Sequence, residues 1–176
     1  MDRLSPEQDL LGTRNDLCVR LARSEREVAT AQELRFSVFY EELKASPDTA
    51  ASHSRRDADR FDAFCDHLIV ARRTAGNEAG KFGVDDGEMV GTYRLLRQSV
   101  AEQNGGFYTQ SEFDIAPLLA AKPALKFLEL GRSCVLKQYR TKPVVELLWQ
   151  GIWNYVRHHG MDVMLGCASL EGTDHR

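Results

Sequence analysis

The last third of the chain constrains the fold most strongly, because it places a long apolar helix between two strand-like segments. Residues 126–136 and 161–168 have the composition of strands, and residues 143–159 have helical periodicity. Pro143 suits the start of this helix, and Gly160 suits its end. A helix that connects two strands through such short links makes them parallel neighbours in one sheet. The sequence therefore predicts a βαβ unit here.

Other segments extend this unit to an α/β fold with a mixed sheet flanked by helices. In chain order we expect a disordered leader at 1–16, a strand at 17–23, a helix at 24–43, a long loop at 44–66, hairpin strands at 67–73 and 88–97 with a Gly-rich connection, and a loop at 98–125 with a short helix near 115–121. Ser24 and Glu27 have the spacing of a capping box, which supports the start of the first helix.

The helix at 143–159 is apolar around most of its circumference. Its polar side chains form one narrow stripe, which consists of Glu146, Gln150, Asn154 and Arg157. A helix of this kind is covered by protein on most sides. We therefore expect Trp149 and Trp153, which lie one turn apart, to belong to the core.

Composition and charge narrow the classes of function. The 176 residues include 43% apolar residues, enough for one domain, and the net charge of −3 gives no support for nucleic-acid binding. The four cysteines have no CxxC spacing and are interpreted as reduced thiols of a cytoplasmic protein. No apolar run reaches the length of about 20 residues that a membrane span needs. We also predict no metal site, because His158 and His159 only close a helix.

A basic loop precedes the long helix. Lys137, Arg140 and Lys142 lie just before the helix N-terminus, where free backbone N–H groups and the helix dipole favour an anion. Val144 and Val145 would offer backbone amides, because the proline before them has none. The spacing predicts a phosphate site, and a solvated basic turn is an equally good interpretation.

The strand before this loop carries an unusual interruption. Glu129 and Arg132 are three residues apart, so a regular strand would direct them to opposite faces. Gly131 between them is typical of a β-bulge, which would bring both charges toward one face and splay the strand from its neighbour. The resulting gap could admit an extended ligand. A structural ion pair between the two charges at a strand edge is the alternative.

Residues 135–145, VLKQYRTKPVV, resemble the acyl-thioester pyrophosphate loop of the GNAT superfamily of N-acyltransferases. Val135 begins this segment, Arg140 falls at the Gln/Arg position of the loop, and Val145 lies near its last small residue. Pro143 stands where the family has glycine. This departure suits a donor with one phosphate, such as the phosphopantetheine of acyl carrier protein, better than the pyrophosphate of coenzyme A.

A second set of residues resembles the acyl-homoserine-lactone synthases of that superfamily. The set consists of Arg35 and Phe39 in LRFSVF, Asp59 and Asp62 in DRFD, Arg94 in GTYRLLR, and Glu129 and Arg132 in LELGR. Further segments of the sequence, including GGFYTQSEFD and GCASLEGTD, are most similar to those of the bacterial ornithine Nα-acyltransferases. Members of that family continue beyond GCASLEGTD. The resemblance thus implies a GNAT-like domain at 17–176, incomplete at its C-terminus, with a mostly antiparallel sheet and a splayed central parallel strand pair.

The resemblance implies transfer of a 3-hydroxyacyl group from acyl carrier protein to the α-amine of L-ornithine, which forms lyso-ornithine lipid without a bound cofactor. Glu129 would act as the base, and an amide between Ser133 and Val135 would hold the oxyanion. Arg94 and Arg132 would bind the carboxylate of the amino acid, because a guanidinium matches a carboxylate in two hydrogen bonds.

The remaining residues of the set would surround the acceptor and the donor. Asp59 and Asp62 would meet the δ-ammonium of ornithine, although solvation beside neighbouring arginines is an alternative. Arg35 and Phe39 would line the site. The alternative for Arg35 is a surface salt bridge, and the alternative for Phe39 is packing in the core. The basic loop would serve the pantetheine phosphate and the acidic face of the carrier protein.

Two other functions share this resemblance. One is an acyl-homoserine-lactone or N-acyl amino acid synthase, which differs in its acceptor. The other is a non-catalytic fragment that binds acyl carrier protein. In each case we expect a cytoplasmic bacterial protein. Peripheral contact with the inner membrane, made through the lipid product, is the alternative location.

Overall fold

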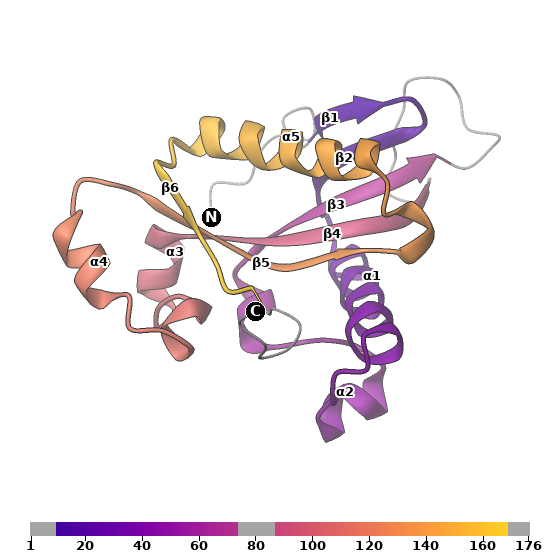
Figure 1. The fold of residues 1–176 in the computed structure, drawn as a ribbon, viewed down its shortest axis with the longest axis horizontal. Helices are drawn as coiled ribbons and strands as arrows, with labels where there is room; N and C mark the ends of the chain where they lie inside the picture. The colour runs from indigo at the N-terminus through magenta and orange to yellow at the C-terminus, as the bar shows by residue number, and fades with distance from the viewer. Residues whose placement is uncertain (1–9, 74–86, 169–176) are drawn as a thin grey trace, which may run out of the picture.

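The computed structural model describes residues 10–73 and 87–168 (Figure 1). Six strands form one sheet in the order β1-β2-β3-β4-β5-β6, with the bounds Leu10–Arg14, Leu17–Leu21, Asp66–Arg73, Gly87–Arg97, Phe127–Val135 and Val163–Leu165. The α-helices are α1 (Glu25–Phe36), α2 (Thr49–Ser54), α3 (Gln98–Gln103), α4 (Ala116–Ala121) and α5 (Lys142–His159). A π-helix, η1 (Ser37–Glu42), and three 3₁₀ turns, η2 (Arg60–Ala63), η3 (Tyr108–Ser111) and η4 (Lys137–Tyr139), complete the described elements.

The sheet is mixed and mostly antiparallel, as predicted. Every neighbouring pair from β1 to β5 runs antiparallel, and β5 and β6 run parallel with α5 as the crossover between them. The pairing of β5 with β6 stops at Glu129 and Leu165, whereas β5 itself continues to Val135. The βαβ unit and the splayed parallel pair are therefore both confirmed.

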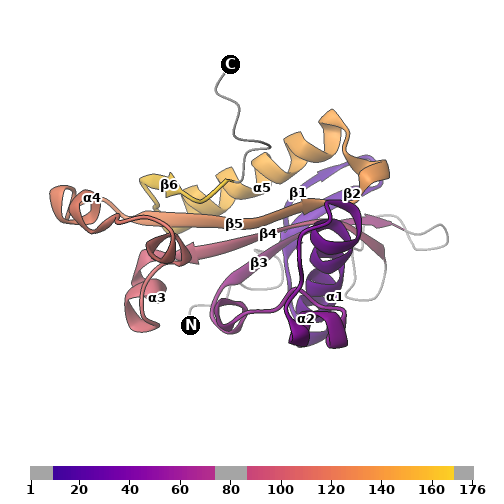
Figure 2. The ribbon, with the colours of Figure 1, turned by 60° about the horizontal axis from the view of Figure 1, so that its bottom comes forward.

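Helices cover both faces of the sheet (Figure 2). Helix α5 packs on one face against β1, β2 and β3, and α1 packs against β3, β4 and β5. The inner side of α5 contributes Leu147, Ile152 and Tyr155 to the main core together with apolar side chains of the strands. The helix ends at Gly160, which has the left-handed φ of 60° that the sequence predicts for a C-cap.

The first helix begins as predicted and ends differently. The Ser24 side chain accepts a hydrogen bond from the Glu27 N–H at 3.3 Å. The Glu27 carboxylate accepts instead from the Arg23 N–H and from Arg20, so the reciprocal half of the capping box is absent. After Phe36 the chain continues as the π-helix η1 rather than as the predicted α-helix to residue 43. This wider turn packs its apolar side chains against the end of β5.

Three segments predicted to be unstructured contain regular elements. The predicted leader is wrong for residues 10–14, which form β1 and pair with β2 through a turn at Asn15 (φ 54°). The loop at 44–66 contains α2 and η2, whose first turns are capped by the side chains of Asp48 and Asp59. The loop at 98–125 contains α3 and η3 besides the predicted α4. Residues 1–9 and the Gly-rich connection of the hairpin lie outside the described residues.

The two tryptophans predicted to be core are exposed. Trp149 is 48% and Trp153 is 56% exposed. The polar stripe of α5 faces β1, where Glu146 pairs with Arg14 and Asn154 donates to a β1 carbonyl. The tryptophans lie on the opposite flank, which the described elements leave open. The prediction failed because the exposed side of α5 is wider than its polar stripe: Glu146, Gln150 and Arg157 are exposed, and so are the two tryptophans beside them.

Three of the four cysteines, Cys18, Cys65 and Cys134, are buried, and Cys167 is exposed. All four are free in the described structure. Burial raises the pKa of Cys65 and of Cys134 to about 12, so neither is a thiolate at neutral pH. Over the described ranges, no helix combines the length and apolarity required to span a bilayer.

Candidate functional site

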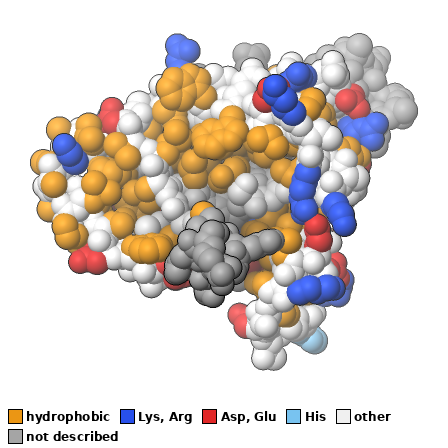
Figure 3. All heavy atoms as spheres, in the orientation of Figure 1, with side chains coloured by type: hydrophobic (Ala, Val, Ile, Leu, Met, Phe, Trp, Pro, Cys, Tyr) orange, Lys and Arg blue, Asp and Glu red, His pale blue; other side chains and the backbone are white. Residues whose placement is uncertain are grey.

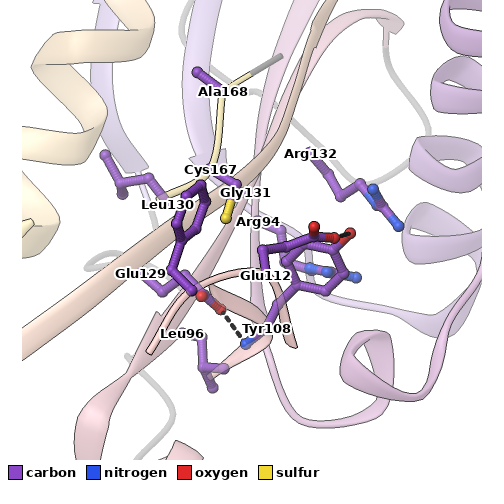
Figure 4. A pocket seen from close by; sticks show the side chains of 11 residues that line it. Arg94, Leu96, Tyr108, Glu112, Glu129, Leu130, Gly131, Arg132, Cys167 and Ala168 are labelled. Atoms are coloured by element: carbon purple, nitrogen blue, oxygen red, sulfur yellow. Dashed lines mark hydrogen bonds between the residues drawn. The ribbon is translucent and has the colours of Figure 1, made fainter. Parts of the chain in front are cut away.

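The centre of the sheet contains the bulge that the sequence predicts. Two residues of β5, Arg132 and Ser133, stand opposite the single β4 residue Tyr93. The bulge lies next to Gly131, but Arg132 is the residue with the left-handed backbone, at a φ of 52°. The extra residue reverses the alternation of side chains, so Glu129 and Arg132 reach one cavity (Figure 4).

This cavity of about 240 Å³ opens where β5 and β6 diverge. Its wall consists of residues 129–132 of β5, Arg94 and Leu96 of β4, Tyr108, Glu112 and Phe113 around η3, and Cys167 and Ala168 after β6. Drug-sized ligands occupy pockets of about 300–1,000 Å³. The cavity is therefore of a size for a small amino acid rather than for a long acyl chain.

Glu129 lies at the base of the cavity and is 5% exposed. Its Oε2 accepts a hydrogen bond from the Tyr108 N–H at 3.0 Å, and its Oε1 accepts from the Thr109 N–H at 2.6 Å (Figure 4). These charge-assisted bonds hold η3 against β5. Arg132 pairs with other carboxylates, so the alternative of an ion pair between Glu129 and Arg132 is wrong.

The arginines beside the cavity belong to a buried network of charges. Arg35 of α1, 1% exposed, pairs with Asp57 at 2.9 Å and with Asp62 at 2.8 Å. Arg94 of β4 pairs with Asp59 at 2.6 Å and with Asp62 at 3.2 Å. The cost of desolvating these charges is offset only while each has its partners. The network therefore ties α1, the segment at 57–62 and β4 into one unit.

Arg132 and Asp59 form the accessible end of this network. Arg132 Nε lies 3.2 Å from Asp57, its Nη2 lies 3.2 Å from Asp59, and its guanidinium lies 5.3 Å from the centre of the Tyr108 ring. The side chains of Arg132 and Asp59 are 27% and 25% exposed, compared with 5% for Arg94. A small ligand could therefore reach Arg132 and Asp59 more readily than the deeper charges.

The other predicted acceptor residues lie away from the cavity wall. Arg35 is buried, so the alternative of a surface salt bridge is wrong, and Asp62 is held by Arg35 and Arg94 rather than solvated. Phe39 is half-buried in η1 and packs against a small cluster with Val38. Neither Arg35 nor Phe39 lines the described cavity. Arg35 contacts the charge network through Asp57 and Asp62.

The charge of Asp62 gives the network a defined pH dependence. Burial raises its pKa, but the hydrogen bond and charge of Arg35, with the charge of Arg94, outweigh burial and lower the pKa to about 2. The folded pKa thus lies below the ordinary value of 3.8. Ionised Asp62 therefore stabilises the fold above about pH 4, and this contribution is lost as the pH falls toward about 2.

We expect the free energy of unfolding to fall by about 2 kcal/mol over this window through Asp62 alone. Urea unfolding followed by circular dichroism at successive pH values would measure it. The Asp62→Asn variant should be less stable at neutral pH and show a flatter acid dependence. Glu25→Gln, which removes an exposed carboxylate of α1, should leave the slope unchanged. Equal slopes in the wild type and Asp62→Asn would contradict the prediction.

The three basic side chains of the loop differ in how far protein groups already bind them. The Nη1 and Nη2 atoms of Arg140 bond to the carboxylate of Glu42 at 2.5 and 2.8 Å, and its Nε donates to the Val135 carbonyl at 3.0 Å. Lys137 is exposed, and Lys142 lies 3.6 Å from a carboxylate oxygen of α5. All three guanidinium nitrogens of Arg140 are thus engaged, and an incoming anion must compete with Glu42.

The predicted amide donors of this loop are already used. The N–H groups of Val144 and Val145 both donate to the Thr141 carbonyl, at 3.1 and 3.2 Å. The prediction that they are free is wrong, because Thr141 rather than Pro143 begins the first turn as its N-cap. The lysines and Arg140 therefore remain as the donors for a phosphate.

Besides several residues of the cavity wall, sequence reasoning missed three groups that bind the predicted charged residues. Asp57 is 4% exposed and joins Arg35 to Arg132, although it lies only two residues before the DRFD motif. Glu42 and the amide donor Thr109 were missed because their partners are distant in sequence. A signal was available for Asp57 alone, as a further carboxylate in an arginine-rich segment.

Comparisons with known proteins identify the family of the chain. Residues 34–150 match the family model described as the acetyltransferase (GNAT) domain. The chain is 51% identical over 169 residues to the L-ornithine Nα-acyltransferase of Rhizobium meliloti (strain 1021), covering 96% of this chain and 55% of the relative. It is 50% identical over 166 residues to the protein of that name from Agrobacterium fabrum, covering 94% and 55%. The chain therefore spans about half the length of the curated relatives it matches.

A solved structure shows the same fold. FeeM, an N-acyl amino acid synthase from uncultured soil microbes, matches with a TM-score of 0.53 at 14% identity, covering 84% of this chain and 70% of that chain. At this identity the likeness concerns the fold alone. The family model spans β3, β4, the bulge in β5 and the start of α5, which together carry the site. The chain belongs to the GNAT acetyltransferase domain family.

Proposed function

We propose that the chain provides the acyl-transfer site of an N-acyltransferase that moves a 3-hydroxyacyl group from acyl carrier protein to the α-amine of L-ornithine. The names of relatives at 50% and 51% identity support the reaction and the acceptor. The observation that carries the proposal is the bulge, which brings Glu129 and Arg132 to one cavity between diverging parallel strands. The choice of a carrier protein as donor rests on Pro143 in the basic loop, which suits one phosphate better than a pyrophosphate.

The accessible end of the charge network suits a zwitterionic acceptor. Arg132 offers guanidinium N–H groups to a carboxylate, and Asp59 offers an acceptor to an ammonium. An amino acid that carries both charges would replace part of the contact between Arg132 and Asp59 with contacts of its own. Arg94 and Asp62 would then hold that pair in position from the buried side.

The chemistry needs one group that accepts a proton from the amine and one hydrogen-bond donor to the oxyanion. The α-ammonium must lose a proton before its nitrogen attacks the thioester carbonyl, and Glu129 would accept that proton directly or through a water. The bulge at Arg132 and Ser133 interrupts the ladder of β5, so an amide between Ser133 and Val135 would face the developing oxyanion. Collapse of the tetrahedral intermediate breaks the carbon–sulfur bond, the nitrogen gives its second proton to the departing pantetheine thiolate, and the amide remains.

The donor would approach along the basic loop. Lys137 and Lys142 are exposed, and Arg140 is held in place by Glu42 and the Val135 carbonyl. These charges would bind the pantetheine phosphate and the acidic surface of the carrier protein. The reaction would take place in the cytoplasm, where the carrier protein is found, with peripheral membrane contact through the lipid product.

Glu42→Gln should tighten binding of a phosphate-bearing donor by up to about fivefold, because the phosphate no longer has to displace an exposed ion pair, and such pairs are weak. Glu42 competes with the phosphate for Arg140, and the hydrogen bond from Arg140 lowers the pKa of Glu42, which keeps that competitor charged. Calorimetric titration with 4′-phosphopantetheine would measure the change. Glu41→Gln, at the neighbouring exposed carboxylate that pairs with Arg55, should have no effect. Weaker binding by Glu42→Gln would contradict the competition.

Mass spectrometry of an incubation with 3-hydroxyacyl carrier protein and L-ornithine tests the proposed function. A new amide at the α-amine is expected. S-adenosylmethionine and other amino acids in parallel incubations test the alternative synthases through their acceptors. No product with any acceptor, together with retention of the carrier protein, would support the non-catalytic binding fragment instead.

A further inference from the structure

Most glycines in the described ranges have a structural reason for their missing side chain. Some have a left-handed backbone, as Gly160 does at a φ of 60°. Others have no room for a side chain. A Cβ atom on Gly151 would lie 2.6 Å from Cγ2 of Val19, and one on Gly166 would collide with the carbonyl oxygen of Leu130. Backbone conformation or packing accounts for these glycines.

Gly131 of β5 is the exception among the glycines in residues 10–73 and 87–168. Its φ does not lie in the left-handed region, because the adjacent Arg132 takes that conformation in the bulge. A Cβ atom on Gly131 would meet no described protein atom within 4 Å. Every other described glycine has either a left-handed φ or a protein atom within that distance. Neither backbone conformation nor packing therefore requires a glycine at position 131.

The missing side chain of Gly131 leaves open space inside the cavity. Residues 129 and 131 lie on one face of β5 because side chains alternate along a strand, and the bulge brings Arg132 to the same face. Gly131 stands opposite Arg94 in the register of β4 and β5, and both line the cavity (Figure 4). The open space therefore lies between the side chains of Glu129 and Arg132. Exposed apolar side chains also gather on the surface of the molecule (Figure 3), but nothing in the structure identifies what covers them.

An α-amino acid has the geometry that this space requires. The proposed function places the amine of the acceptor at Glu129 and its carboxylate at Arg132. Both groups are bonded to one carbon, so the α-carbon must lie between the two side chains and over Gly131. The cavity measures only about 240 Å³, and a misplacement of about 1 Å at a reacting group can cost about 100-fold in rate. One added methyl group at position 131 is therefore significant.

We propose that Gly131 is a specificity-determining residue whose missing side chain provides the space for the α-carbon of the acceptor. The α-carbon contacts the backbone at Gly131, which directs the amine toward Glu129 and the carboxylate toward Arg132. This inference rests on the proposed function, which supplies an acceptor with both groups on one carbon. It assigns the space over Gly131 to the amino acid and not to the thioester or the acyl chain of the donor.

Gly131→Ala and Gly131→Val test the inference through binding, without any need for catalysis. Calorimetric titration with L-ornithine should show an affinity at least about tenfold lower in Gly131→Ala, because the added methyl group overpacks the contact with the α-carbon. The larger Gly131→Val side chain should abolish measurable binding of L-ornithine. In steady-state kinetics of Gly131→Ala, we expect the KM for L-ornithine to rise by a similar factor and the KM for the acyl donor to stay unchanged.

Three controls separate this role from a structural one. The midpoint of thermal unfolding of Gly131→Ala should stay the same or rise by a few degrees, because alanine fits here without strain and restricts the unfolded chain. The affinity for 4′-phosphopantetheine should be unchanged in Gly131→Ala. Gly12→Ala, in strand β1, should leave the affinity for L-ornithine unchanged, because its Cβ would meet only the end of the Gln150 side chain, at 2.9 Å.

Several results would overturn the inference. They are no affinity of the wild type for L-ornithine, an undiminished affinity in Gly131→Val, a lower unfolding midpoint in Gly131→Ala, which would assign the glycine to the bulge, and a loss of affinity for 4′-phosphopantetheine instead of L-ornithine, which would assign the space to the donor.

The inference and the proposed function can fail separately. If the wild type acylates L-ornithine and Gly131→Ala does so with an unchanged KM, the inference is wrong and the function stands. If the wild type binds L-ornithine and Gly131→Ala loses that affinity, but no amide forms in the wild type, the function is wrong and the inference stands.

Discussion

Arg35→Met should lower the free energy of unfolding by about 3–5 kcal/mol, the largest stability effect that we expect from one substitution. Arg35 is 1% exposed and is the cation shared by Asp57 and Asp62. Its removal leaves both carboxylates buried with fewer partners, and the cost of that desolvation is not recovered. Urea unfolding followed by far-ultraviolet circular dichroism would measure the loss.

Two further variants make this prediction specific. Arg56→Met removes an exposed ion pair with Glu33 and should cost at most about 1 kcal/mol. Asp57→Asn in the Arg35→Met background should recover part of the stability, because it removes one of the two buried charges that Arg35→Met leaves with fewer partners. A loss below about 1 kcal/mol in Arg35→Met would show that the network is not a unit of stability.

Glu129→Gln should lower the rate of amide formation by about 10²–10⁴-fold, the typical contribution of a general base. The glutamine keeps the shape of the side chain and one acceptor oxygen for the amides of Tyr108 and Thr109. It cannot take a proton from the acceptor amine. Steady-state kinetics with 3-hydroxyacyl carrier protein and L-ornithine would show the loss in kcat.

A structural role for Glu129 predicts a different pattern. If Glu129 only anchors η3, the residual activity of Glu129→Gln should keep the acid limb of the wild-type pH profile. If Glu129 is the base, that limb should disappear. Glu112→Gln is the matched control, since Glu112 lines the same cavity but is exposed and bonds only to the Tyr108 hydroxyl among the contacts described here. An equal loss in both variants would contradict the assignment of the base.

Local patterns in the sequence determined the elements that depend on nearby residues. Ser24 capped α1, Gly160 ended α5, and the apolar periodicity of residues 143–159 produced the crossover that makes β5 and β6 parallel. Gly131 marked the bulge, because a residue without a side chain in a strand is tolerated where the ladder is interrupted. Each of these features follows from backbone preferences within a few residues.

Tertiary structure alone decided which charges meet and which apolar faces are covered. Asp57 pairs with Arg35 and Arg132, and Glu42 pairs with Arg140, across separations in sequence that carry no periodic signal. The exposure of Trp149 likewise depends on where α5 crosses the sheet and not on its own composition. Such contacts arise because packing brings distant segments together and because a buried charge must find a partner wherever the fold supplies one.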